Sequence, residues 1–347
     1  MRDITVEELN EERWRGGTVP IDVRSPGEFA DATIPGSLNI PLFDDGERAE
    51  VGTLYVQAGV EAAKRRGLEI VSAKLPAFVD QFARVPGDKT VFCWRGGMRS
   101  KVTATLLSLM DIRVRRLAGG YRAYRRWVVQ FLETAEIRPR MVVLHGLTGT
   151  GKSWMLRRLA ADGFPVLDLE AMAGHRGSIF GEVGLRANNQ KTFDALLAEA
   201  LVRWRNAPFL LMEAESRRIG KVVLPERLWA KKEEGLHLLV ELPLEERVRL
   251  ILQDYEPWNH HEACLAAFRR IKEAIHTPVA KEIESLLLRQ AYAPAVELLL
   301  AFYYDSRYRH AGRHYDIRPE HVIRARHVEE ACGRVRELLL GLGGAGR

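Results

Sequence analysis

The chain has 347 residues, of which 46% are hydrophobic and 28% are charged. This length suits two domains, and the composition excludes a disordered, collagen-like or fibrous protein. The formal net charge of +6 permits a polyanionic partner without requiring one. The three cysteines are widely spaced, and the sequence shows neither an apolar leader nor a long apolar run. We therefore expect a cytoplasmic protein with no membrane partner.

Short apolar strands alternate with helices in the first part of the sequence. Strands are expected at residues 18–23, 90–93 and 114–117, and helices at 54–74, 100–110 and 121–136. The charged helical stretch 54–74 resembles an insertion between sheet elements. This alternation predicts a parallel α/β sheet. Pro139 interrupts the chain just before a new apolar strand, so we place the first domain at residues 1–136.

The same pattern restarts after Pro139. Strands are expected at residues 141–145, 164–169, 208–213 and 236–242, and helices at 151–161 and 189–205. From residue 244 to residue 342 the pattern is almost continuously helical. We therefore predict a phosphate-binding α/β core at residues 140–245, with a helical C-terminal region at residues 246–347 packed on it.

A cysteine ends the strand at residues 90–93, and a helix is expected about six residues later. The intervening sequence is Cys93-Trp94-Arg95-Gly96-Gly97-Met98-Arg99-Ser100. Loops of this kind direct backbone N–H groups at one point, and the helix dipole favours an anion there. We expect Cys93 to act as a nucleophilic thiolate, aided by Arg95 and Arg99. The other loop residues expected to contact the ligand are Gly96, Gly97 and Ser100; the alternative is a buried structural cysteine.

Five residues separate Cys93 from Arg99, which makes a seven-residue loop. Loops of this length resemble those of dual-specificity and arsenate-type phosphatases, which hold a tetrahedral phosphate. Shorter loops suit transfer from thiosulfate-like donors. The resemblance therefore implies a phosphate-like donor, and a protein phosphatase stays an alternative.

Residues 146–153 match the pattern G-x-x-x-x-G-K-[ST] in full, after an apolar strand and at the start of an expected helix. The backbone of such a loop cradles a di- or triphosphate. Lys152 neutralises outer phosphate oxygens, and Ser153 can ligate Mg²⁺. The remaining phosphate-binding residues expected here are Gly146, Thr148, Gly149, Thr150 and Gly151. The pattern fits a nucleotide and a diphosphate ester equally well.

An acidic residue at the end of a later strand usually supports such a loop. Asp168 and Glu213 are the candidates, with Glu215 just beyond, although each could simply cap a turn. His175 and Arg176 form a further pair that could contact a phosphate or diphosphate.

The first half of the chain resembles a rhodanese domain over about residues 5–130. The matching stretches are IDVRSPGEF at 21–29, IPGSLNIP at 34–41, the Cys93 loop and LAGGY at 117–121. Thr33 stands where this family often has histidine, at a position that is usually structural. The resemblance implies that Cys93 carries sulfur or selenium as a persulfide or perselenide.

The whole chain resembles the tRNA 2-selenouridine synthase family, because a rhodanese-like domain precedes a P-loop domain. Further marks are AEVGTLY at 49–55, HRGS at 175–178, FG at 180–181, EAESRRIG at 213–220 and YYD at 303–305. The resemblance implies a transferase that replaces sulfur by selenium at C2 of the wobble 2-thiouridine in a subset of tRNAs.

The resemblance further implies two steps. The sulfur is first alkylated by geranyl diphosphate, and selenium from selenophosphate, carried as a Cys93 perselenide, then displaces the geranylthiol. An alkylated sulfur leaves as a thiol, whereas a thiocarbonyl sulfur leaves poorly as sulfide. Our hypothesis is that the P-loop holds the diphosphate and that Lys152 stabilises the departing diphosphate. The use of ATP stays open.

An RNA enzyme needs basic patches with aromatic side chains for stacking. Residues 113–127 and 303–315 supply both, although each could be an ordinary solvated face. Two other functions remain as alternatives. One is an ATP-dependent P-loop kinase or NTPase fused to a sulfurtransferase, and the other is a non-catalytic RNA-binding scaffold.

Overall fold

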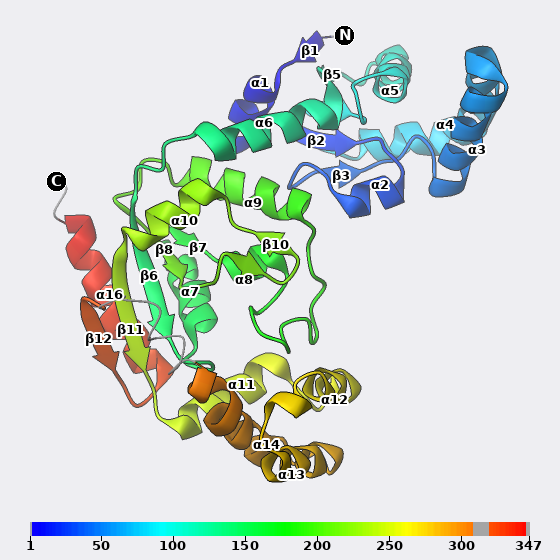
Figure 1. Ribbon diagram of the computed structural model, residues 1–347. Helices are drawn as coiled ribbons and strands as arrows, with labels where there is room; N and C mark the ends of the chain where they lie inside the picture. The colour runs from blue at the N-terminus through cyan, green and yellow to red at the C-terminus, as the bar shows by residue number, and fades with distance from the viewer. Residues whose placement is uncertain (1, 308–318, 345–347) are drawn as a thin grey trace. The chain divides into compact units, whose positions relative to one another are not determined.

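The computed structural model describes residues 2–307 and 319–344. The chain divides into two compact units, residues 1–134 with 194–196, and residues 135–193 with 197–347. Each unit is built on a five-stranded parallel sheet flanked by helices (Figure 1). The α/β fold class predicted from the alternating pattern is confirmed. Within the described residues, none of the helices is both long enough and apolar enough to span a bilayer.

The first unit arranges its strands in the order β1-β5-β4-β2-β3. Its central strands β2 and β4 are buried almost throughout, as expected for a parallel sheet with helices on its faces. Its elements are β1 (Arg2–Ile4), α1 (Val6–Trp14), β2 (Val19–Asp22), α2 (Pro26–Asp31), β3 (Leu38–Asn39), α3 (Asp45–Gln57), α4 (Gly59–Ala83), β4 (Lys89–Phe92), α5 (Met98–Leu109), β5 (Val114–Leu117) and α6 (Gly120–Thr134).

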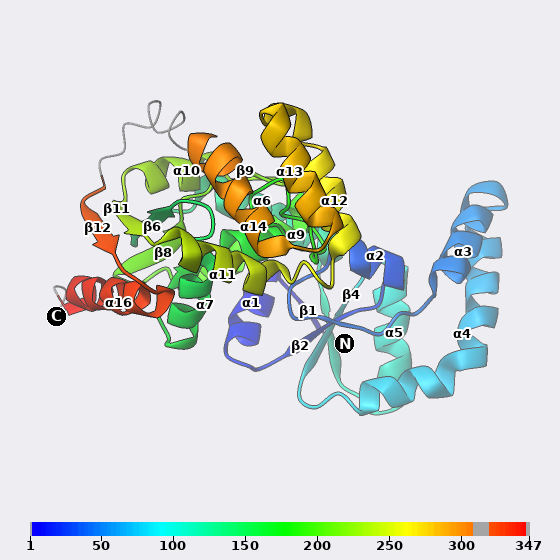
Figure 2. The same ribbon diagram turned by 90° about the horizontal axis from the view of Figure 1, so that it is seen from below.

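The single helix expected at residues 54–74 is instead divided between two helices, α3 and α4. Gly59 has a φ of +87°, a left-handed conformation that ends one helix and lets the chain turn into the next. The 25-residue helix α4 contains Pro76, which cannot donate a helical hydrogen bond, and the helix bends along its length (Figure 2). Val71, Phe78 and Phe82 of α4 pack into the core beneath the sheet.

The second unit arranges its strands in the order β12-β11-β6-β8-β7, with the strand before the P-loop in the centre. A two-stranded antiparallel hairpin, β9 with β10, lies outside this sheet. Its elements are β6 (Arg140–Gly146), α7 (Lys152–Ala161), β7 (Val166–Leu167), α8 (Leu169–Ala173), α9 (Gln190–Arg203), β8 (Phe209–Glu213), β9 (Arg218–Ile219), β10 (Val222–Val223), α10 (Glu226–Glu233), β11 (Leu236–Glu241), α11 (Leu244–Tyr255), α12 (His261–Arg269), η1 (Lys272–Ala274), α13 (Thr277–Leu288), α14 (Tyr292–Leu299), η2 (Leu300–Tyr304), β12 (His321–Arg324) and α16 (Val328–Gly344).

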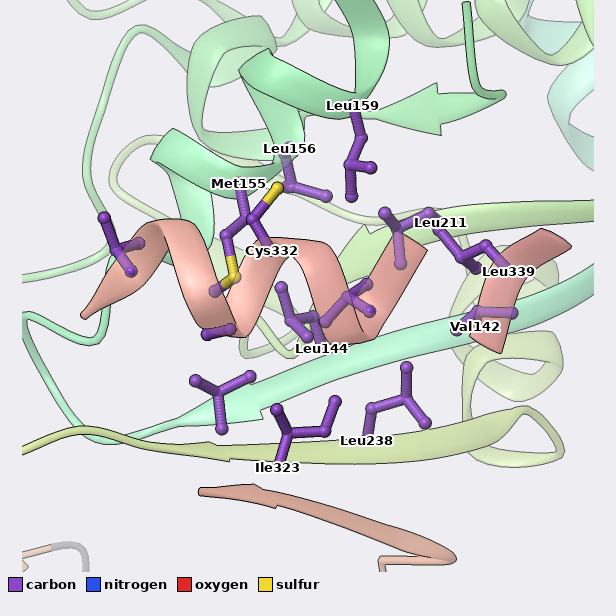
Figure 3. Packing of buried hydrophobic residues seen from close by; sticks show 14 of the residues in the cluster. Val142, Leu144, Met155, Leu156, Leu159, Leu211, Leu238, Ile323, Cys332 and Leu339 are labelled. Atoms are coloured by element: carbon purple, nitrogen blue, oxygen red, sulfur yellow. The ribbon is translucent and has the colours of Figure 1, made fainter. Parts of the chain in front are cut away.

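Helices α7 and α16 cover one face of this second sheet. Figure 3 shows Met155, Leu156 and Leu159 of α7 meeting Cys332 and Leu339 of α16 above the strands. All five side chains are almost fully excluded from water, and the α7 residues recur at helical spacing. The core therefore fixes the start of α7, which is the end of the P-loop.

The expectation of an almost continuous helical C-terminal region is wrong in one respect. Residues 321–324 form β12, which pairs in parallel with β11 from Leu238↔His321 to Glu241↔Arg324. The segment HVIR has only two apolar residues, Val322 and Ile323, and this run is too short to mark a strand in the sequence. The segment is a strand because it pairs with the free edge of β11, and this pairing is visible only in the structure.

Candidate active sites

Cys93 follows β4 directly, at the base of a loop that leads into α5. Its side chain is buried, and Sγ lies 3.3 Å from the Oγ of Ser100 in the first turn of the helix. The backbone N–H groups of residues 94–97 donate no hydrogen bond within residues 2–307 and 319–344. Such unpaired donors at the start of a helix favour an anion. The loop can therefore hold a tetrahedral anion beside the thiol.

The start of α6 holds this loop in shape. The backbone N–H of Tyr121 donates to the carbonyl of Cys93, and that of Arg122 donates to the carbonyl of Trp94, both at 2.9 Å. A Cβ on Gly120 would lie 2.2 Å from the Cys93 carbonyl oxygen, and the φ of Gly120 is +59°. Both observations require glycine at this position.

The two loop arginines differ in their surroundings. Arg95 is exposed, whereas the guanidinium of Arg99 forms a bidentate pair with the carboxylate of Glu28, at 2.5 and 3.2 Å. Burial opposes the charge of Arg99, but the hydrogen bonds and charge of Glu28 outweigh it and raise the pKa of Arg99. Arg99 is thus charged but already paired. The sequence did not indicate Glu28, because 71 residues separate the two.

Thr33 has the structural role that was expected of its position. Its Oγ1 donates to Oδ2 of the fully buried Asp22 at 2.9 Å. The same carboxylate pairs with Arg24, whose guanidinium lies 4.3 Å above the ring centre of Tyr121. This buried network supports the end of β2 and the start of α6.

The P-loop connects β6 to α7 in the second unit. Gly149 and Gly151 have φ values of +83° and +72°, so the loop uses left-handed conformations that glycine tolerates. The ammonium of Lys152 donates to the carbonyl of Gly146 at 2.9 Å and approaches that of Leu147 at 3.4 Å. Lys152 therefore lies folded over its own loop, where a phosphate would replace the carbonyl oxygens.

A cavity of about 870 Å³ opens beside the P-loop, and residues 148–153 line it. Glu215 and Arg176 also contribute to its wall, while Asp168, His175 and Glu213 are not among the lining residues. Part of the wall is apolar or aromatic, and it comprises Trp154, Ile179, Trp229, Leu239, Leu250, Ile251, Tyr255, Tyr303 and Tyr304. Cationic, acidic and apolar side chains therefore share one cavity.

Glu170 is the carboxylate nearest to the P-loop hydroxyl, and the sequence did not single it out. Its Oε2 accepts from the Oγ of Ser153 at 2.7 Å, and its backbone N–H donates to Oε1 of Glu213 at 2.8 Å. Burial, followed by the charge of Glu215, raises the pKa of Glu170 to about 7. Its position two residues after Asp168 was the only available signal.

Glu213 ends β8 and is fully buried. Its second oxygen, Oε2, has no hydrogen-bond partner within the described part of the chain. Burial raises its pKa well above the usual value, and Asp168, Glu170 and Glu215 add to the effect. The carboxylates of Glu215 and Glu170 both approach Gly177. A Cβ atom added to this glycine would lie 2.5 Å from Glu215 Oε2 and 3.1 Å from Glu170 Oε1.

The other predicted residues of this unit mainly support the structure around the cavity. Asp168 caps α8, accepting from the backbone N–H of Ala171 at 2.9 Å. His175 is buried, and its Nδ1 accepts from the backbone N–H of Gly177. Arg176 lines the cavity but pairs with Asp254 at 2.8 Å and stacks on a tyrosine ring. Neither His175 nor Arg176 is therefore a simple free phosphate ligand.

The predicted nucleic-acid patches are only partly described. In residues 113–127, Arg115 and Arg116 pair with Glu12 and Asp3, whereas Arg122 is exposed on α6. In the second patch, Tyr303 and Tyr304 line the cavity, and residues 308–315 lie outside the described residues.

Two family models match the chain. A rhodanese-like domain covers residues 5–126, and the AAA domain of tRNA 2-selenouridine synthase covers residues 139–280. A tRNA 2-selenouridine synthase from Cupriavidus pinatubonensis (strain JMP 134 / LMG 1197) is 35% identical over 327 residues, which span 84% of this chain and 88% of that protein. The chain belongs to the tRNA 2-selenouridine synthase family. The family resemblance inferred from the sequence is confirmed, and the family is one of enzymes.

Other members of the tRNA 2-selenouridine synthase family align over different lengths. The relative from Shewanella halifaxensis (strain HAW-EB4) is 31% identical over 325 residues, 84% of this chain and 87% of that protein. The relative from Cupriavidus necator is 37% identical over 246 residues, which span 69% of this chain and 66% of that protein. The chain thus spans just under two thirds of the latter relative's length.

Proposed function

We propose that the chain converts the wobble 2-thiouridine of a subset of tRNAs to 2-selenouridine. The reaction proceeds by S-geranylation with geranyl diphosphate, followed by selenation from selenophosphate. The single observation that carries the proposal is that one chain of this family contains both sites. One is a cysteine followed by loop N–H groups that are unpaired in the described part of the chain, and the other is a P-loop beside a cavity with a partly apolar wall. Selenophosphate is a tetrahedral anion and suits the first site. A prenyl diphosphate suits the second.

The selenium step requires Cys93. Attack of its thiolate on selenophosphate forms an S–Se bond and breaks the Se–P bond, whose electron pair leaves on phosphorus as phosphite. Hydrolysis of selenophosphate instead yields phosphate and a selenide that keeps the bonding electrons and attacks C2 itself. The phosphorus product, identified by phosphorus NMR, therefore decides whether Cys93 carries a perselenide. Phosphite supports the carrier. In that case the terminal selenium of the perselenide displaces geranylthiol at C2, and a thiol then attacks the Cys93 sulfur, forming a disulfide and releasing the selenium on the base. Phosphate instead assigns Cys93 to holding the donor.

The geranylation step is assigned to the cavity of the second unit. Backbone N–H groups of the P-loop and the Lys152 ammonium would bind the diphosphate, so that negative charge developing on the leaving group is stabilised. The apolar wall, which includes Ile251 and Tyr304, would bury the ten-carbon chain. Displacement of Lys152 from the carbonyl of Gly146 is then part of substrate binding.

The oxygen donors beside Lys152 fit Mg²⁺. Ser153 Oγ and Glu170 Oε2 lie 2.7 Å apart, and Glu213 accepts from the backbone N–H of Glu170 through Oε1. The other oxygen of Glu213, Oε2, has no hydrogen-bond partner in the part of the chain that the structure describes. Among the described residues, no three His, Cys, Asp or Glu side chains are arranged to hold a metal by themselves. Diphosphate oxygens would therefore complete the shell around Ser153. When bound, Mg²⁺ would neutralise part of the diphosphate charge.

The decisive experiment is mass spectrometry of nucleosides from tRNA incubated with protein, geranyl diphosphate and selenophosphate. We expect S-geranyl-2-thiouridine and then 2-selenouridine, and the absence of both would refute the proposal. Cys93→Ala should still geranylate but fail to selenate. Lys152→Ala should fail to geranylate yet selenate pre-geranylated tRNA; the reverse pattern would refute the assignment of the P-loop.

A P-loop kinase or NTPase fused to a sulfurtransferase is the second candidate. The observation that favours it is the complete G-x-x-x-x-G-K-S loop with its neighbouring carboxylates. Substrate-stimulated ATP turnover that is lost in Lys152→Ala would support this function. Geranylation without added nucleotide would exclude a requirement for ATP.

A further inference from the structure

Arg99 and Glu28 form a shielded ion pair next to the Cys93 loop. The guanidinium of Arg99 makes two hydrogen bonds to the carboxylate, and the two side chains are only 21% and 19% exposed. Arg48 lies farther away, with its Nε 3.9 Å from Glu28 Oε2, and is largely exposed. Arg99 is thus the principal partner of this carboxylate.

The carboxylate of Glu28 is also held in place by Ser25, at the start of α2. Its Oε2 accepts from the backbone N–H of Ser25 at 3.2 Å and from the Ser25 hydroxyl at 3.3 Å, which caps α2. Burial would raise the pKa of Glu28, but Arg99 and the Ser25 N–H outweigh burial and lower it. Glu28 therefore remains an anion in the neutral range, at a position that does not depend on any bound ligand.

Arg99 adjoins the residue that contacts the sulfur. Ser100 Oγ lies 3.3 Å from Cys93 Sγ, and Arg99 precedes it in the first turn of α5. An anion held by the loop amides and by Arg99 has to share the guanidinium with Glu28 or displace it. Two anions, one permanent and one transient, therefore compete for a single cation.

We propose that Glu28 is a positioning residue that competes with the bound phosphorus oxyanion for Arg99 and thereby promotes its release from the Cys93 loop. The inference rests on the proposed function, in which a phosphorus oxyanion is left behind when selenium has been transferred. Without Glu28, Arg99 would hold this product with its full charge, since charge-assisted bidentate pairs to such oxyanions are strong. By weakening the hold of Arg99 on this product, Glu28 allows the Cys93 loop to bind the next selenophosphate.

Binding of inorganic phosphate to the full chain tests this, in a Lys152→Ala background so that the P-loop does not contribute. Glu28→Gln removes the charge but keeps an oxygen that can accept from Ser25. We expect calorimetry to show phosphate bound about tenfold more tightly by Glu28→Gln than by the background protein. Glu61→Gln, which alters an exposed pair with Lys64 on α4, is the matched control and should change nothing.

A double variant separates competition from a structural effect. In Arg99→Ala, the Glu28→Gln substitution should no longer tighten phosphate binding. The proposal would be overturned if Glu28→Gln bound phosphate no more tightly than the background protein. It would also be overturned if Glu28→Gln tightened phosphate binding equally in Arg99→Ala, or if no variant bound phosphate. Loss of the α2 cap alone would lower the melting temperature without tightening phosphate binding.

The selenation assay supplies a second readout. Phosphate and phosphite should inhibit Glu28→Gln at about tenfold lower concentration, with a reduced kcat and an unchanged or lower KM for selenophosphate. Equal inhibition of Glu28→Gln and the unmodified chain would overturn the proposal. Failure of the proposed function would be recognised separately, because no 2-selenouridine would form while the phosphate affinities still differed.

Discussion

Arg247 Nη2 lies 2.6 Å from Asp305 Oδ1, and Nη1 lies 2.9 Å from Oδ2, in a bidentate pair that is largely shielded from water. The Nε of the same guanidinium donates to the carbonyl of Thr148, within the P-loop, at 2.9 Å. One arginine of α11 therefore connects the phosphate-binding loop to the residue that follows η2.

Asp305→Ala should destabilise the second unit and loosen the P-loop. The substitution leaves the buried Arg247 guanidinium without its carboxylate, which costs about 3 kcal/mol of the free energy of unfolding. Urea unfolding measures this loss, and calorimetry with pyrophosphate should show weaker binding. Asp305→Asn keeps one acceptor and should lose less. Wild-type stability in Asp305→Ala would show that other groups compensate for the pair.

Gly120→Ala should disable the Cys93 loop selectively. The added methyl would collide with the carbonyl of Cys93, a backbone atom, in a left-handed conformation that alanine disfavours. We expect loss of selenation with geranylation retained, measured by nucleoside mass spectrometry. Gly52→Ala in α3 is the control, because a Cβ there meets nothing within 4 Å. Full selenation by Gly120→Ala would contradict the loop geometry.

Glu170→Gln should change how the P-loop responds to Mg²⁺. Because the pKa of Glu170 is about 7, most of this carboxyl group is ionised at pH 8. Removing its charge beside Ser153 relieves repulsion, so at pH 8 pyrophosphate should bind about threefold to tenfold more tightly without Mg²⁺. Any strengthening of pyrophosphate binding by Mg²⁺ in the unmodified chain should be reduced in the variant. Calorimetry with and without Mg²⁺ measures both effects, with the exposed Glu245→Gln as control. If Mg²⁺ strengthened pyrophosphate binding equally in the variant and the unmodified chain, Glu170 would have no role in Mg²⁺ binding.

Glu246→Gln should destabilise the second unit in a pH-dependent way. The hydrogen bonds from Arg249, and that from the Val328 backbone N–H at 3.0 Å, lower the pKa of Glu246 to about 2. A carboxyl group whose pKa is lower in the folded state stabilises the protein above its ordinary value of 4.5, and this is lost as the pH falls toward 2.

Urea unfolding at several pH values tests the role of Glu246. We expect Glu246→Gln to cost about 1–3 kcal/mol at pH 7, and the difference from the unmodified chain to fall by about half or more at pH 3. Glu245→Gln, at an exposed neighbouring position, should show no such trend. A difference that did not vary with pH would mean that the carboxylate charge is unimportant.

The strands before both loops could be predicted from the sequence, because each is a short apolar run with glycines directly or shortly after it. Residues 141–145 and 90–93 have this pattern, and they correspond to β6 and β4 with small shifts at their ends. Glycine spacing also located the P-loop. Both loops are built from residues that are adjacent in the sequence, so their residue types and spacing can be recognised without knowing the fold.

The pairing of distant residues could not be predicted. Glu28 meets Arg99 across 71 residues, and Arg247 meets Asp305 across 58, with no pattern that links either pair. Glu170 was missed for a different reason. Asp168 is the N-cap of α8 and Glu170 lies in the first turn of that helix, so only the fold decides which of the two carboxylates faces Ser153.

The late position of β12 has a consequence for biosynthesis. Glu241 of β11 pairs with Arg324 of β12 across 83 residues, and α11 to α14 are translated between them. On the ribosome, β11 therefore keeps a bare hydrogen-bonding edge until almost the whole polypeptide has emerged, and such edges attract other strands. A nascent chain that is truncated before His321 would therefore expose the unpaired edge of β11, which β12 covers in the folded protein.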